Sequence, residues 1–360
     1  MLVYYTKRRE VLRERLRNYL SRTGENISPK KILWKGRPVN KRDIYIVVME
    51  SFINPLLLNV KYEGDPLFPG IRKYLIDGSR FSHVISPVYG GGTAQAEFEI
   101  LTGVPAFGMI DSIEFNALEG YRIESFINEL RKYGYYAYAT IGTKSWYYNS
   151  QKAYRSVGFD EVSFLDRNSY FRKRKGDHFI FDGDLFKANI RLVREKLLKK
   201  KPFVDYILTM YGHLPYYRNT ELRPDVVKAI DAPDSINRIA NQFYYRTKSL
   251  EWFINSIIKF DPASIILVVA DHIPPVLENG IKYNLKNWNI NIALFVIDGK
   301  PVDISGKHYY EIPWCLWDIL REKHNSLCRR RVSERNLRNL YILLMGEGMG
   351  YLKLKRNLVY

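Results

Sequence analysis

The run Ile44-Tyr45-Ile46-Val47-Val48-Met49, followed at once by Glu50-Ser51, decides the fold. All six residues are apolar or aromatic, which is typical of a strand that is covered on both faces of its sheet. Four similar runs follow along the chain, at residues 135–141, 204–210, 265–270 and 292–297. The sequence therefore predicts a sheet buried between two layers.

Helical patterns lie between these runs, at residues 94–101, 122–133, 185–200, 237–259 and 313–320. Strands that alternate with helices are typical of an α/β fold, because parallel strands need a crossover connection. We therefore expect a mainly parallel central sheet with helices on both faces.

Composition limits the classes of protein that the chain can be. Its 360 residues are 46% hydrophobic and 14% aromatic, which suffices for a large core and excludes a disordered chain. Two cysteines are too few for a disulfide framework or a cysteine-ligated zinc site. No stretch reaches the roughly 18 apolar residues of a membrane-spanning helix, and charged residues from Lys7 onward exclude a signal peptide.

Three regions differ in character. Residues 1–42 form a basic leader, and Leu12, Leu16 and Leu20 lie four apart, on one face of a predicted helix over residues 2–20. Residues 43–330 hold the alternating pattern and are predicted to form the catalytic domain. Residues 331–360 form a basic C-terminal tail.

The chain carries 56 basic and 38 acidic residues, a formal net charge of +18. Nucleic acid, an anionic membrane surface or an anionic substrate would each suit such a charge. No nucleic-acid-binding signature accompanies it, so we expect a membrane surface and anionic substrates, and no nucleic acid.

Polar residues follow four of the predicted strands. Ligands of an open α/β sheet bind beyond the carboxyl ends of its strands. The residues at these ends are Glu50, the loop residues Lys144 and Trp146, His213, and the pair Asp271-His272. A strand must turn polar where it ends, so each alone has a structural explanation. Their joint occurrence predicts a functional site.

Two carboxylates and one imidazole, from Glu50, Asp271 and His272, suit Mn²⁺, Mg²⁺ or Zn²⁺ and offer no soft ligand for copper. We expect one divalent cation, with manganese as the first choice. A hydroxyl, water or substrate oxygen would complete the ligand shell.

The segment Gly90-Gly91-Gly92-Thr93 supplies the candidate hydroxyl. Three glycines permit a tight turn and a close approach to a ligand, and Gly103 marks the end of the helix that follows. A helix N-terminus stabilises an alkoxide or a bound phosphate. The alternative is that Thr93 is only an N-cap.

These motifs resemble the lipoteichoic acid synthase group of the alkaline phosphatase/sulfatase superfamily. The resemblance extends from about residue 43 to about residue 298. The motifs that carry it, in the order of the family, are residues 46–52, 90–103, 181–186, 208–216 and 269–272.

The resemblance implies a metal-dependent phosphotransferase on the extracytoplasmic face of the bacterial cell membrane. Such enzymes take a phosphoglycerol-type or phosphoethanolamine-type group from an anionic or related phospholipid donor. They pass this group through a phosphothreonine intermediate to a glycan or polymer acceptor of the cell envelope.

By the same resemblance, Thr93 is the nucleophile, and His213 and Trp146 line the substrate pocket. We add Lys144 to the substrate-binding residues, and His213 has the chemistry to protonate a leaving alkoxide. The implied metal ligands are Glu50, Thr93, Asp271 and His272.

The sequence also departs from the family. The run after Ser145 reads Trp146-Tyr147-Tyr148-Asn149, where the family tends to have Trp-Asn-Arg, so the phosphate-binding arginine is missing. A histidine that precedes this tryptophan in the family has no counterpart, and the usual transmembrane helices are absent.

Three other functions remain as alternatives. A sulfatase needs a Cys or Ser in a Cys/Ser-x-Pro-x-Arg context, and neither Cys315 nor Cys328 has one. A phosphodiesterase would use the same residues and release the phospho-group to water. A non-catalytic protein that binds anionic glycans would have no physical need for the complete set of predicted ligands.

Overall fold

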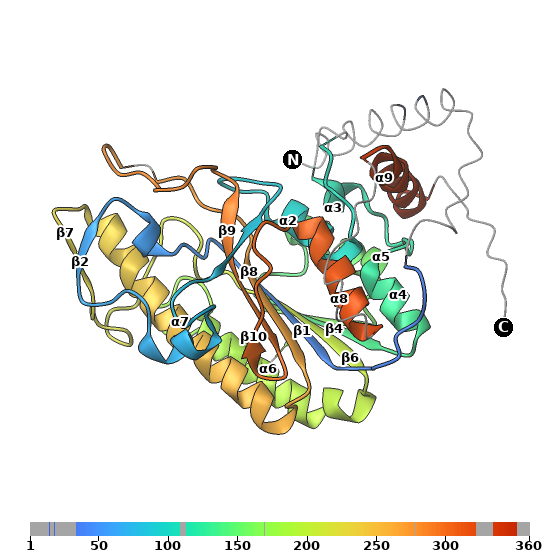
Figure 1. The fold of residues 1–360 in the computed structure, drawn as a ribbon, viewed down its shortest axis with the longest axis horizontal. Helices are drawn as coiled ribbons and strands as arrows, with labels where there is room; N and C mark the ends of the chain where they lie inside the picture. Colours follow the sequence, from blue (N-terminus) through green and yellow to red (C-terminus); the bar gives the residue numbers. More distant parts are fainter. Residues whose placement is uncertain are drawn as a thin grey trace.

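A sheet of eight strands runs through the central domain (Figure 1). The computed structural model describes residues 34–108, 113–168, 170–276, 278–321 and 334–350, together with the isolated positions 14 and 18. The order is β10-β9-β8-β1-β6-β4-β5, and β3 also pairs with β9. The strands are β1 (Ile44–Met49), β3 (Ser82–Ile85), β4 (Tyr136–Ile141), β5 (Glu161–Phe164), β6 (Phe203–Leu208), β8 (Ile265–Ala270), β9 (Ile290–Ile297) and β10 (Lys300–Pro301). A separate pair joins β2 (Lys61–Glu63) to β7 (Lys228–Ile230).

The five strands β8, β1, β6, β4 and β5 are parallel to one another. Strand β9 is antiparallel to β8, because the described part of the connection between them contains no helix that could carry the chain back to the other end. The predicted mainly parallel sheet is confirmed.

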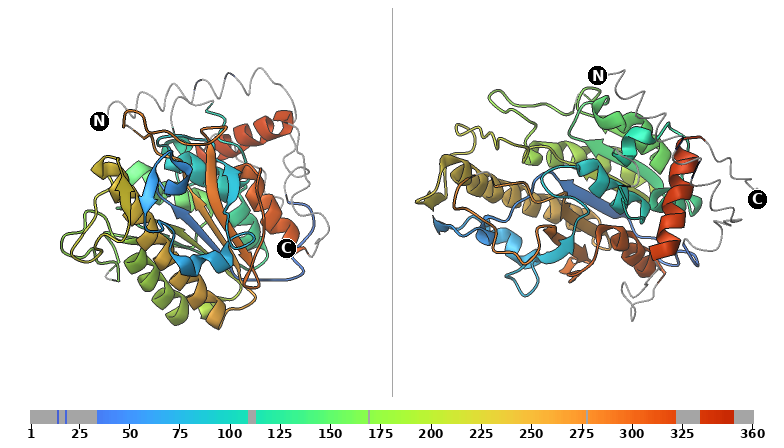
Figure 2. Two further views of the ribbon diagram at one scale, coloured as in Figure 1. Left: turned by 60° about the vertical axis from the view of Figure 1, so that its left-hand side comes forward. Right: turned by 90° about the horizontal axis from the view of Figure 1, so that it is seen from above.

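Helices cover both faces of the sheet, as predicted (Figure 2). Strand β1 shows the division, since Ile46 packs into one apolar core and Val47 into the other. One face carries α2 (Thr93–Thr102), α3 (Glu114–Ala117), α4 (Phe126–Lys132), α5 (Ser150–Val157), α8 (Ile312–Leu320) and α9 (Glu334–Gly348). The other carries α6 (Asp182–Glu195) and α7 (Asp234–Phe260).

Two of the predicted helices have different limits in the structure. The predicted helix over residues 122–133 begins only at Phe126, because the Ser125 side chain accepts a hydrogen bond from the Asn128 N–H and caps it. The predicted helix over residues 185–200 divides into α6 and a 3₁₀ turn, Leu197–Lys200.

Parts of the leader and of the tail contact the central domain. Trp34 is buried and stacks on Trp314 of α8, with ring centroids 4.1 Å apart. Helix α9 buries Leu340 and Leu344 in the core of the α2 face. The predicted helix over residues 2–20 lies outside the described residues apart from positions 14 and 18. No helix of the described chain is long and apolar enough to cross a membrane.

Strand register brings the predicted site residues to one edge of the sheet. Met49 lies opposite Ala270, and Val48 lies opposite both Val269 and Leu208. Because these strands are parallel, the polar residues that follow β1, β6 and β8 emerge side by side.

Asp205 of β6 makes the stability of the fold depend on pH. It is fully buried, it accepts a hydrogen bond from Asn189 at 3.2 Å, and burial raises its pKa to about 8. Between pH 4 and 8 the folded chain therefore holds a proton that the unfolded chain has lost, so stability falls as pH rises.

We expect the free energy of unfolding of wild type, relative to Asp205→Asn, to fall between pH 4 and 8 by up to about 1.4 kcal/mol per pH unit. Asparagine has the same shape and does not titrate, so the comparison isolates one proton. Urea unfolding of both proteins at four pH values measures the difference. Parallel pH profiles would show that Asp205 is not buried in its protonated form.

Candidate active site

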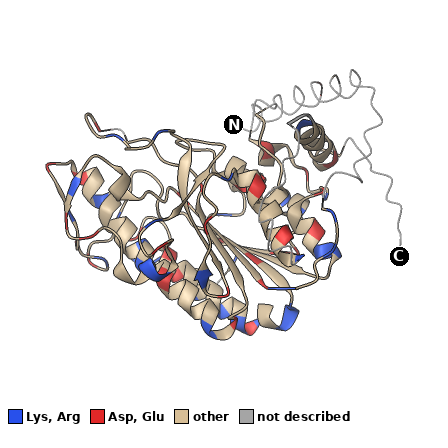
Figure 3. Cartoon of the chain, viewed as in Figure 1, with Lys and Arg blue, Asp and Glu red and all other residues tan. Residues whose placement is uncertain are grey.

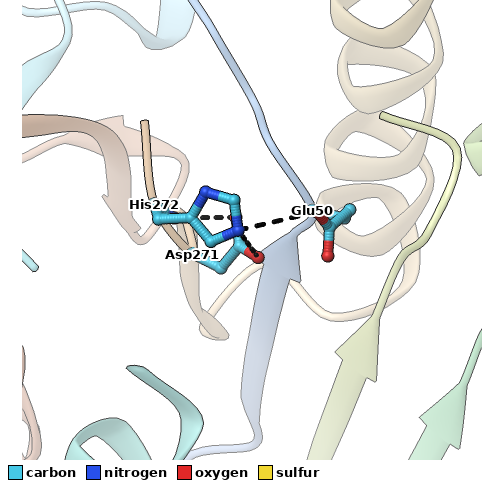
Figure 4. A group of neighbouring side chains, drawn as sticks. All are labelled: Glu50, Asp271 and His272. Carbon is cyan, nitrogen blue, oxygen red and sulfur yellow. Dashed lines mark hydrogen bonds and ion pairs between the residues drawn. The ribbon is translucent and has the colours of Figure 1, made fainter. Parts of the chain in front are cut away.

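Four of the predicted residues meet at the carboxyl edge of the sheet. Thr93 Oγ1 lies 2.7 Å from Asp271 Oδ2 and 3.2 Å from Glu50 Oε2. His272 Nε2 lies 3.3 Å from Asp271 Oδ2 and 3.7 Å from Glu50 Oε1 (Figure 4). Glu50, Asp271 and His272 are buried, and Thr93 is partly buried.

Backbone contacts orient the Asp271 carboxylate. Its Oδ1 accepts hydrogen bonds from the N–H groups of Ser51 and His272, both at 2.7 Å. Ser51 has a φ of +46°, a left-handed conformation that is uncommon for a residue with a side chain. Because Oδ1 is held in this way, Oδ2 is turned toward Thr93 and His272.

The glycine turn brings Thr93 to the carboxylates. Gly90, Gly91 and Gly92 have φ angles of +71°, +147° and +87°, which only glycine adopts readily. Gly92 is the N-cap of α2 and Thr93 is its first helical residue, with no side-chain capping bond. The N-cap alternative for Thr93 is therefore wrong, since its hydroxyl contacts the two carboxylates. The predicted helix end at Gly103 is confirmed, with a φ of +74°.

Two carboxyl groups and an imidazole lie close together in this buried site, where ionised carboxylates are unfavourable unless a positive charge accompanies them. Burial and the neighbouring Asp271 carboxylate raise the pKa of Glu50 to about 7, and burial raises the pKa of Asp271. Burial lowers the pKa of His272, which favours the neutral imidazole that binds metals. A cation between these groups would offset the charge.

A cavity of about 130 Å³ opens over Thr93. Among the described residues that line it are the glycine turn, Glu50, Glu97, Tyr147, Tyr148, His213 and His272, and none of them is Lys or Arg. Figure 3 shows many basic residues on helices α6 and α7 instead. A phosphate group in this cavity would meet carboxylates and imidazoles, and no lysine or arginine among the described lining residues.

The residues present fit a bound divalent cation. Glu50, Asp271 and His272 each offer one ligand atom, and these atoms lie within 4.8 Å of one another. Thr93 Oγ1, in contact with both carboxylates, would be the fourth ligand. Two hard oxygen donors and one imidazole suit manganese, magnesium or zinc.

His213 lines the same cavity and has a defined tautomer. Its Nδ1 lies 2.8 Å from the carbonyl oxygen of Leu214. A carbonyl only accepts hydrogen bonds, so Nδ1 carries the proton and Nε2 is the nitrogen that can gain and lose one.

Lys144 and Trp146 lie on the loop after β4 and are not among the residues that line the cavity. The Lys144 ammonium lies 5.9 Å from the centre of the Trp146 ring, and Trp146 is 70% exposed. The neighbouring Tyr147 and Tyr148 do line the cavity, and the sequence interpretation did not select them.

Arg246 of α7 contacts the backbone of the site residue Glu50. The sequence interpretation did not identify this arginine. It is 2% exposed, its Nε pairs with Asp182 at 2.6 Å, and its Nη2 donates to the Glu50 carbonyl at 2.8 Å. A Cβ atom on Gly212 would lie 2.2 Å from both Arg246 Nη1 and the Glu50 carbonyl oxygen, so this position has room only for glycine. Two of the sequence motifs thus help to hold Arg246 in place. The motif at residues 181–186 does so through Asp182, and the motif at residues 208–216 does so through Gly212.

Glu97 lies one turn after Thr93 on α2 and is also buried at the cavity. Its Oε1 accepts hydrogen bonds from the hydroxyls of Tyr206, at 2.7 Å, and Tyr154. Burial raises its pKa to about 7. These contacts tie the helix that carries Thr93 to β6 and α5.

Divalent metal should stabilise the protein through Asp271. At a free metal concentration 100 times the Kd, binding adds about 2.7 kcal/mol to the free energy of unfolding. We expect manganese or zinc to raise the Tm of wild type, EDTA to reverse the change, and Asp271→Asn to remove it.

Asp205→Asn is the matched control, since it alters another buried aspartate at the opposite end of the parallel strands and should keep the full metal response. Calorimetric scans with and without metal give the comparison. An equal rise in Tm for Asp271→Asn would mean that the metal binds elsewhere.

Residues 42–309 match the protein family described as Sulfatase. The chain belongs to the sulfatase family. The superfamily expected from the motifs is thereby confirmed.

A curated relative described as "Putative cyclic beta-1,2-glucan modification protein", from Rhizobium meliloti (strain 1021), is 30% identical over 248 residues. The match covers 67% of this chain and 36% of the relative, so the chain spans about a third of that protein's length.

Two solved structures have a similar fold. The lipoteichoic acid synthase LtaP from Listeria monocytogenes has a TM-score of 0.60 at 18% identity, over 78% of this chain and 72% of that one. The Streptococcus pyogenes phosphoglycerol transferase GacH, solved with sn-glycerol-1-phosphate, has a TM-score of 0.61 at 13% identity, over 97% and 92%. At these identities the similarity supports the fold.

Proposed function

We propose that the chain is a metal-dependent phosphotransferase with Thr93 as its nucleophile. It moves a phosphoglycerol-type or phosphoethanolamine-type group from a phospholipid to a glycan of the cell envelope. One observation carries the proposal: the Thr93 hydroxyl, at a helix N-terminus, contacts both Asp271 and Glu50 in a cavity whose described lining contains no lysine or arginine.

In the first half of the reaction, Thr93 Oγ1 attacks the phosphorus of the donor and the bond from phosphorus to the lipid alkoxide breaks. The hydroxyl proton leaves toward Asp271 Oδ2, which already accepts it in a hydrogen bond. A divalent cation, manganese by preference, would lower the pKa of the hydroxyl and offset charge on the phosphoryl oxygens. His213, protonated at Nε2, gives its proton to the departing alkoxide.

In the second half, an acceptor hydroxyl attacks the phosphothreonine. Neutral His213 takes the proton of that hydroxyl at Nε2, the bond from phosphorus to Thr93 breaks, and Asp271 Oδ2 returns the proton to Thr93 Oγ1. His213 thus ends the cycle protonated, as it began. Lys144 and Trp146, outside the cavity, would contact the parts of the substrates that extend from it.

The partners follow from the same proposal. An anionic phospholipid is the donor, and the net charge of +18 favours a membrane surface that carries it. The name of the Rhizobium meliloti relative suggests a cyclic β-1,2-glucan as the acceptor. The place of action would be the extracytoplasmic face of the bacterial membrane.

A transfer assay tests the proposal. Metal-loaded protein is incubated with head-group-labelled phosphatidylglycerol or phosphatidylethanolamine in vesicles, with and without cyclic β-1,2-glucan. We expect label on the glucan. Release of label to water alone, unchanged by glucan, would make the protein a phosphodiesterase. No donor cleavage with any divalent metal would favour a non-catalytic glycan-binding protein.

A further inference from the structure

Two exposed aromatic side chains form a pair beside the glycine turn. Tyr89 is 43% exposed and Trp288 is 58% exposed, and their ring centroids lie 5.6 Å apart with the planes at 74°. The pair is therefore preformed, with much of both ring surfaces open to solvent.

The sheet fixes the position of this pair. Ile85 of β3 lies opposite Ile290 of β9, and the Ser86 N–H donates to the Asn289 carbonyl at 2.9 Å. Tyr89 follows the first strand by four residues, and Trp288 precedes the second by two. Two segments far apart in sequence are thus held together by backbone hydrogen bonds.

The pair is also tied to the active site. Gly90, directly after Tyr89, lines the cavity, and its N–H donates to the carbonyl of Ile273, the residue after His272. Any group bound on Tyr89 and Trp288 therefore lies next to the mouth of the cavity that holds Thr93.

Exposed aromatic rings that lie together at the edge of a catalytic cavity are typical of a binding surface. A pyranose ring has an apolar face of C–H groups and a polar rim of hydroxyls. It can cover an aromatic ring while its hydroxyls remain in water or reach into the cavity. In the transfer reaction one of these hydroxyls must reach the phosphorus on Thr93.

We infer that Tyr89 and Trp288 form the acceptor platform, on which a sugar ring of the glucan stacks during transfer. This inference rests on the proposed function for its choice of acceptor. The platform would set acceptor affinity and leave the chemistry of donor cleavage to Thr93 and the metal ligands.

Isothermal titration calorimetry with cyclic β-1,2-glucan, in the absence of any donor, tests the platform. We expect Trp288→Ala and Tyr89→Ala to weaken glucan binding at least about 10-fold, because each removes a stacking surface. Trp288→Phe keeps an aromatic ring and should bind within about threefold of wild type. Trp252→Ala is the matched control, since Trp252 is 38% exposed on α7 and does not line the cavity.

Transfer kinetics give a second readout. We expect Trp288→Ala to raise the KM for glucan at least about 10-fold while donor cleavage without glucan stays at the wild-type rate. Far-UV circular dichroism and Tm should match wild type, since the ring is exposed. Unchanged glucan binding in Trp288→Ala would overturn the inference. So would a loss of binding to phosphatidylglycerol vesicles with glucan binding intact, which would make the pair a membrane contact.

The two proposals fail in different ways. Glucan binding is measured without donor, so it does not depend on the transfer reaction. Normal glucan binding that Trp288→Ala weakens, in a protein that cleaves no donor, would count against the proposed function alone.

Discussion

Replacing Thr93 with alanine is expected to lower turnover at least about 10³-fold while the fold stays intact. The substitution removes the hydroxyl that we propose attacks phosphorus, and no other described side chain offers a hydroxyl in contact with both Glu50 and Asp271. It removes no helix cap, because Gly92 is the N-cap of α2. Steady-state transfer of labelled head group to glucan measures the effect.

Thr93→Ser keeps the hydroxyl but loses the methyl group that restricts its rotamer. We expect a loss of about 10- to 100-fold, because the oxygen is less well oriented. Thr102→Ala is the matched control, since it removes a threonine hydroxyl from the far end of the same helix, where it donates to the Phe98 carbonyl. Turnover of Thr93→Ala equal to wild type, with metal bound, would mean that water attacks the donor directly.

Arg246→Met is expected to lower the free energy of unfolding by roughly 3–5 kcal/mol, since it leaves Asp182 buried without its ion-pair partner. For a chain of this size that corresponds to a fall in Tm on the order of 5–10 °C. Activity should fall as well, because Arg246 also donates to the Glu50 carbonyl and so positions a proposed metal ligand. Urea unfolding and transfer rates, measured on the same preparations, check both effects.

Arg174→Met is the matched control for this prediction. Arg174 pairs with Asp184, which lies on α6 as Asp182 does, but the Arg174 side chain is 54% exposed. An exposed ion pair contributes at most about 1 kcal/mol, so this variant should unfold nearly as wild type does. Equal losses for Arg174→Met and Arg246→Met would contradict the buried role of Arg246.

The strands of the parallel core could be predicted because each is an apolar run ending in polar residues. Strands β3 and β5 could not, since Ser82–Ile85 and Glu161–Phe164 are short and mixed in polarity. Strand β5 lies at one end of the strand order, and β3 pairs with β9. Each of the two is only partly buried. Their pairing depends on neighbours distant in sequence.

The grouping of Glu50, Asp271 and His272, the proposed metal ligands, could be predicted because parallel strands bring their ends to one edge. Arg246 could not, since it lies within a long helical pattern in which a basic residue is expected to face solvent. Its burial depends on Asp182, 64 residues earlier in the chain. The contact between Tyr89 and Trp288 depends likewise on the pairing of β3 with β9.

If Thr93 carries the transferred group, peptide mass analysis will detect that group on the protein. Metal-loaded protein is incubated with phosphatidylglycerol without acceptor, quenched in acid and digested. We expect one phosphoglycerol group on the peptide that contains Thr93, its absence in Thr93→Ala, and its loss when glucan is added. A wild-type protein that modifies glucan with no adduct on that peptide, or with the adduct on another residue, would show that Thr93 is not the nucleophile.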